Sequence, residues 1–110
     1  MPNSRGLVEG RHYTEYVEKI KELKRNNQYP DAISLLLQCI DAVEAEAAAN
    51  RSGVAPWYYE QLAIIYHKQK DPIGELKVLE KFAKQKRAPG ESSIKLVERL
   101  ERMKKKMDLG

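Results

Sequence analysis

The chain has little of what several classes of protein require. Only one of its 110 residues is a cysteine, Cys39, which excludes an internal disulfide and suits a reducing compartment. The longest uninterrupted apolar run, residues 62–66, is far shorter than the roughly 20 residues of a transmembrane helix. The opening residues 1–12 contain no apolar segment of the kind that secretory signals need. We therefore expect a cytoplasmic protein without a membrane partner.

Residues that commonly carry catalysis or hold cofactors are also scarce. The two histidines, His12 and His67, are far apart, and neither has a cysteine or an acid at ligand spacing. Cys39 falls on the apolar stripe of a predicted helix, where a thiol packs as a small hydrophobe. The sequence contains no glycine-rich phosphate loop. We expect no enzyme activity, no metal site and no cofactor.

What is present suits a helical globular protein. Apolar residues make up 42% of the chain and charged residues 33%, and glycine and proline are sparse. The net charge of +4 is unevenly distributed. Residues 1–76 carry a balance of −2 and residues 77–107 a balance of +7. The basic charge is therefore concentrated in the last third of the chain.

Apolar residues recur at steps of three and four, which predicts five helices. We expect an all-α fold of two stacked antiparallel hairpins and a C-terminal capping helix. Residues 1–10 have no periodic pattern, which predicts a flexible arm. The predicted parts are hairpin one at about 12–49, hairpin two at about 56–87 and the capping helix at about 91–107, within a single domain over 11–107.

A short polar turn occurs twice at an offset of 43 residues. Residues 27–33 and 70–76 each end one amphipathic helix and begin another. Asparagines end the first helix, and Asp71 with Pro72 begins the fourth as an N-cap acceptor followed by a proline at the first helical position. A helix–turn–helix unit that recurs at a fixed offset indicates stacked helical hairpins, which usually bind other proteins.

The second hairpin resembles a tetratricopeptide repeat. The family's order of leucine, small residue, aromatic and acidic turn is matched by Leu62, Ala63, Tyr66 and Asp71. The resemblance extends over about residues 12–87. In the first hairpin, the turn and the opening of the second helix match at Asn27, Tyr29, Ala32 and Ile33.

The chain departs from the family's pattern at several positions. Ile20 and Glu75 stand where small packing residues belong, and Pro72 replaces the turn aromatic. The offset of 43 exceeds the family's repeat of about 34 residues. The capping helix corresponds to the family's C-terminal cap, which seals the last hairpin.

The resemblance implies a concave groove lined by the first helix of each hairpin. The residues expected on it are Val17, Lys21, Lys24, Arg25, Glu60, Ile64, His67 and Lys68. The family's clamp for a peptide carboxylate is not reproduced, because Val17 and Gln61 stand where lysine and asparagine belong. Four basic residues on the groove still favour a short acidic peptide or an acidic partner surface. We therefore expect a non-enzymatic protein–protein interaction module, either an adaptor or an accessory subunit.

Two other functions remain open. The basic region 84–106 could associate with nucleic acid, although no aromatic residues are interleaved with its lysines, so nucleic acid is not the expected partner. Alternatively, a second copy of the chain could cover Val97 and Met107, making a homodimer. Trp57, at the exposed start of the third helix, is a possible anchor for a partner.

Overall fold

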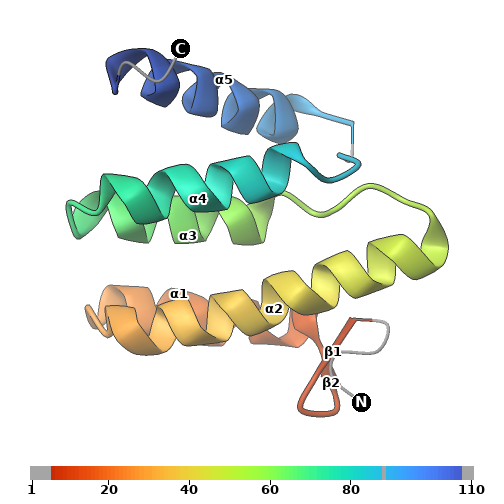
Figure 1. Cartoon of the computed structure of the whole chain (residues 1–110). Helices are drawn as coiled ribbons and strands as arrows, with labels where there is room; N and C mark the ends of the chain where they lie inside the picture. Colours follow the sequence, from red (N-terminus) through yellow and green to blue (C-terminus); the bar gives the residue numbers. More distant parts are fainter. Residues whose placement is uncertain (1–5, 88, 108–110) are drawn as a thin grey trace. The chain divides into compact units, whose positions relative to one another are not determined.

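The computed structural model of the chain describes residues 6–87 and 89–107. These residues form five α-helices, one 3-10 helix and a small two-stranded sheet (Figure 1), so the predicted all-α class is confirmed. None of the described helices is long and apolar enough to cross a membrane. The chain divides into two compact units, Met1–Ser52 and Gly53–Gly110, which are described one at a time. The single domain that we expected over 11–107 stays a prediction.

The first unit holds a short sheet followed by a helical hairpin. Its elements in chain order are β1 (Leu7–Val8), β2 (Arg11–His12), the 3-10 helix η2 (Tyr13–Tyr16), α1 (Val17–Arg25) and α2 (Tyr29–Asn50). The core side of the hairpin is apolar, as the periodicity predicts. Its fully buried residues include Ile20, Ala32, Leu36, Cys39 and Ile40.

The small sheet shows that the flexible arm predicted for residues 1–10 is wrong from β1 onward. The turn between β1 and β2 has positive φ at Glu9 (48°) and Gly10 (83°), as in the tight two-residue turns that match the twist of paired strands. Val8 is 1% exposed, and its carbonyl accepts a hydrogen bond from the Tyr16 hydroxyl at 2.8 Å. The chain is therefore fixed from β1 onward, and the first five residues of the predicted arm lie outside the described part.

The second unit holds a helical hairpin and a further helix. Its elements are α3 (Trp57–Lys68), α4 (Pro72–Ala83) and α5 (Glu91–Lys106). α3 and α4 run antiparallel, and α5 packs beside α4 (Figure 1). The rings of Tyr59 and Phe82 meet at a centroid distance of 5.1 Å, and α5 buries Leu96 and Leu100 against the hairpin. The apolar stripe predicted for the last helix is therefore confirmed.

The turn that ends α1 recurs, with the same backbone geometry, at the end of α3. Asn27 and Lys70 both have left-handed φ angles, 57° and 56°. The next N–H donates back across the turn in each case, from Gln28 to Leu23 and from Asp71 to Tyr66, both at 2.9 Å. This is a Schellman C-cap. The offset of 43 residues is therefore a repeat of backbone conformation as well as of sequence.

α4 lies against the Tyr66 ring of α3 at a glycine. A Cβ added to Gly74 would lie 2.8 Å from that ring and 2.7 Å from the Asp71 carboxylate. Asp71 caps α4, since its Oδ1 accepts a hydrogen bond from the Gly74 N–H at 2.9 Å. Gly74 is therefore the small residue at which α4 comes close to the Tyr66 ring of α3.

Candidate functional site

The eight residues expected on the groove divide between the two units. They are Val17, Lys21, Lys24 and Arg25 in the first unit and Glu60, Ile64, His67 and Lys68 in the second. Lys21, Arg25 and Lys68 are exposed, as is His67, and the other four are half-buried. His67 and Lys68 also line a pocket that lies wholly within the second unit.

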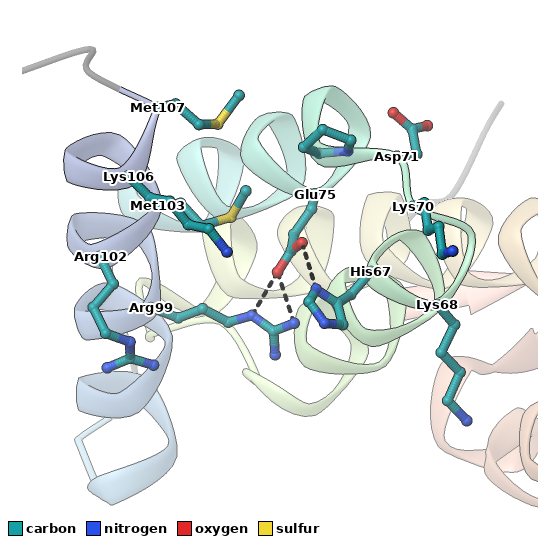
Figure 2. A pocket seen from close by; sticks show the side chains of 11 residues that line it. His67, Lys68, Lys70, Asp71, Glu75, Arg99, Arg102, Met103, Lys106 and Met107 are labelled. Atoms are coloured by element: carbon teal, nitrogen blue, oxygen red, sulfur yellow. Dashed lines mark hydrogen bonds and ion pairs between the residues drawn. The ribbon is translucent and has the colours of Figure 1, made fainter.

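This pocket is a depression of about 980 Å³ beside α5, opposite the turn between α3 and α4 (Figure 2). We call it the α5 pocket. It is lined by His67, Lys68, Lys70, Asp71, Pro72, Glu75, Arg99, Arg102, Met103, Lys106 and Met107. Five of these side chains are lysine or arginine and two are acids. The pocket is therefore basic, with an apolar component from two methionines and a proline.

Glu75 lies at the base of the pocket and joins all three helices. It is 4% exposed. Its Oε2 accepts a hydrogen bond from Nε of Arg99 at 2.7 Å and lies 2.7 Å from a terminal guanidinium nitrogen of the same residue (Figure 2). Its Oε1 lies 3.3 Å from Nδ1 of His67. Because a buried carboxylate must be paired and hydrogen-bonded, Arg99 anchors α5 to α4 and is largely neutralised there.

The other four cations surround this base. Lys68 and Lys70 come from the end of α3 and its turn, whereas Arg102 and Lys106 stand one helical turn apart on α5. No carboxylate in the described part of the chain forms an ion pair with any of them. Asp71, the other acid of the pocket, is engaged as the cap of α4. A concave surface with excess positive charge attracts anionic ligands.

A second polar cluster lies in the first unit around Glu46. Nε2 of His12 lies 2.6 Å from Oε2 of Glu46, and the Tyr13 hydroxyl donates to Oε1 at 2.9 Å. Burial raises the pKa of the Glu46 carboxyl, but these two hydrogen bonds outweigh it, so the pKa lies below the ordinary 4.5. Burial, aided by Glu46, raises the pKa of Tyr13 to about 12. The cluster ties β2 and η2 to the later part of α2.

Thr14 extends this cluster into a row of hydroxyl, imidazole and carboxylate. Its Oγ1 lies 2.9 Å from Nδ1 of His12, and its backbone N–H donates to the same Nδ1 at 3.3 Å. Such a row resembles the relay that activates a nucleophile. Here, however, the ring accepts the N–H of Thr14 as the N-cap of η2. We therefore assign the row a structural role in holding the sheet against α2.

Both histidines have an acidic neighbour that their sequence spacing does not reveal. Glu46 reaches His12 from 34 residues away, and Glu75 reaches His67 from the following helix. No group of three or more histidine, cysteine, aspartate or glutamate residues in the described ranges is placed to hold a metal ion. Cys39 is fully buried, as predicted, and burial raises the pKa of its thiol to about 11.

Trp57, the possible anchor, lies at the start of α3 and is half-buried. Its ring meets Tyr58 edge to face, with centroids 5.0 Å apart. The indole therefore contacts Tyr58 and is partly accessible, and its role as an anchor stays a prediction. Trp57 is not among the residues that line the α5 pocket.

Sequence reasoning found His67 and Lys68 but missed the other lining residues. A usable signal was present in the predicted capping helix. Arg99, Arg102 and Lys106 recur at steps of three and four, which places them on one face of a helix. None of the family models, curated proteins or solved structures compared with this chain matches it.

Proposed function

We propose that this protein is a non-enzymatic interaction module that binds an acidic segment of a partner protein at the α5 pocket. The observation that carries this proposal is the cluster of four cations without carboxylate partners in the described part of the chain, around a concave surface. Lysine and arginine in such a setting form charge-assisted hydrogen bonds with carboxylates. They also steer an acidic partner during its approach.

The architecture supports a binding role. We propose that the two hairpins are diverged tetratricopeptide repeats, since they share one C-cap geometry 43 residues apart. Leu62 and Ala63, which carry the resemblance, are fully buried in α3. Proteins built from stacked hairpins of this kind expose extended surfaces that bind other molecules.

Selection from a random dodecapeptide library displayed on phage tests the proposal. We expect the 110-residue protein to enrich sequences rich in aspartate and glutamate. The double variant Arg102→Gln/Lys106→Gln should lose at least tenfold in affinity for the selected peptides, because two charge-assisted contacts are removed. The matched variant Lys77→Gln/Lys84→Gln removes the same charge from exposed positions outside the pocket and should bind as the wild type does.

Two outcomes would contradict this function. One is a selection that enriches no acidic sequence. The other is an equal loss of affinity in both double variants, since the net charge of the protein, and not the pocket, would then govern binding. Isothermal titration calorimetry with a synthetic selected peptide gives the affinities.

A further inference from the structure

The α5 pocket has an apolar row beside its basic one. Residues 96 and 100 of α5 are buried in the core. At 3.6 residues per turn, Met103 and Met107 continue that apolar row toward the end of α5, and Arg102 and Lys106 lie to one side of it, further round toward solvent. Both methionines are half-buried and line the pocket. Figure 2 shows Met103 and Lys106 extending from α5 toward Glu75, while Arg102 and Lys68 extend away from it.

The charged groups of the pocket also differ between its base and its outer part. The inner pair of Glu75 and Arg99 is internally neutralised. Pro72, from the start of α4, adds further apolar surface to the lining. Of the unneutralised cations, Lys106 extends over the recess, whereas Arg102 and Lys68 extend away from it toward its margins (Figure 2). A ligand that fits this order has an apolar group directed inward and negative charges on either side of it.

From this order we infer that the acidic segment carries an apolar side chain that packs against Met103 and Met107 while its carboxylates meet the surrounding cations. This inference rests on the proposed function and specifies the ligand of the same site. Methionine side chains are flexible and polarisable, so they adapt to apolar groups of differing shape. A depression of about 980 Å³ is at the upper end of the range of about 300–1,000 Å³ for ligand pockets, which leaves room for a side chain and its flanking backbone.

A peptide segment suits this surface better than an anionic membrane. Peripheral proteins bind membranes through the apolar face of an amphipathic helix laid into the headgroup region. Here the apolar groups of α5 face a recess between helices and are bordered by cations. A single inserted side chain reaches such a recess, whereas a bilayer surface does not.

The test uses the peptides recovered by the selection described above. Each peptide is resynthesised with its apolar residues replaced one at a time by serine. We expect one position at which this replacement lowers the affinity about tenfold or more, as the loss of one buried apolar side chain predicts. The protein variant Met103→Ser/Met107→Ser should lose affinity for the parent peptide by a similar factor. The wild-type protein and this variant should bind the serine peptide with the same affinity. The serine in the peptide and the serines in the protein each remove the same apolar contact, so the second change costs nothing more.

The matched control is Ile94→Ser, which alters an exposed apolar residue of α5 outside the pocket; it should leave both affinities unchanged. Circular dichroism and urea denaturation establish that the variants fold. If the double variant does not fold, Met107→Ala alone replaces it, and we expect a smaller loss of affinity for the parent peptide.

The possible results distinguish a failure of this inference from a failure of the proposed function. Acidic peptides that bind equally with and without their apolar residues overturn this inference and leave the proposed function standing. A selection without acidic sequences overturns both. Vesicles of phosphatidylserine that bind the protein and displace the peptides would assign the surface to lipid and overturn the inference. The protein could also have a doubled mass in solution that falls to the monomer mass in Met107→Ala. The methionines would then belong to a dimer interface, and this result would overturn the inference.

Discussion

Two glutamates, Glu46 and Glu75, connect segments that are distant in the sequence. Glu46 bonds to His12 and Tyr13, more than 30 residues earlier, and Glu75 bonds to Arg99, 24 residues later. Sequence reasoning treats Glu75 only as a departure from a family pattern. Neither partner can be found from helical spacing, because the pairing depends on which helices pack together.

The Glu46 cluster predicts a specific dependence of stability on acid. Because the pKa of Glu46 is lower in the folded protein than the ordinary 4.5, ionised Glu46 contributes stability that is fully present above the unfolded pKa. That contribution is lost as the pH falls through the folded pKa. Urea denaturation should therefore show the free energy of unfolding falling more steeply below about pH 5 in the wild type than in Glu46→Gln.

The matched control for this experiment is Glu98→Gln, at an exposed position on α5, whose curve should run parallel to that of the wild type. Parallel curves for the wild type and Glu46→Gln would contradict the role assigned to the His12–Glu46–Tyr13 cluster. At neutral pH, Glu46→Gln should also be less stable than the wild type, because a charge-assisted hydrogen bond to His12 is removed.

At the scale of whole elements, the sequence predicted helices well because the signals for their ends are local. Asp71 and Pro72 mark the start of α4, and the turn at Asn27 marks the end of α1. The β1–β2 hairpin was missed because two-residue strands are too short to show an alternating pattern. Glu9 and Gly10 were its only available signal. The α5 pocket was missed because it depends on the packing of α5 against α4, which periodicity does not specify.

The attachment of α5 to α4 predicts a non-additive response to mutation. Removing one partner of a buried ion pair costs about 3–5 kcal/mol; Arg99 keeps 25% of its side chain exposed, so about 2 kcal/mol is expected here for Glu75→Met or Arg99→Met. The double variant Glu75→Met/Arg99→Met should lie within about 1 kcal/mol of the wild type, because apolar residues often replace such pairs without loss.

Chemical denaturation of the four proteins, combined as a double-mutant cycle, measures this coupling. Additive losses in the double variant would show that the two residues do not stabilise the attachment of α5 through their contact. A coupling of the expected size would identify the pair as the contact that holds α5 in register and so forms the pocket.

At the scale of the whole molecule, the net charge of +4 conceals two basic clusters in the second unit. One, residues 84–87, follows α4, and the other, residues 104–106, closes α5. Because α4 and α5 run antiparallel (Figure 1), the clusters lie at opposite ends of the pair, roughly 24 Å apart along α5 at 1.5 Å per residue. Arg87 is also engaged locally, since its guanidinium donates to the Ala83 carbonyl at 3.0 Å.

This separation predicts weak association with nucleic acid. The affinity for a single-stranded polyanion falls with salt with a logarithmic slope of about −0.7 per phosphate contacted, so the four unneutralised cations of the α5 pocket would give a slope of about −3. We expect fluorescence anisotropy with a labelled 20-nucleotide RNA to show weak binding at 50 mM salt and none at 150 mM. A slope of about −5 or steeper, with tight binding at 150 mM salt, would mean that both clusters contact the strand. Nucleic acid would then replace the acidic peptide as the ligand, because a peptide confined to the α5 pocket cannot engage both ends of the helix pair.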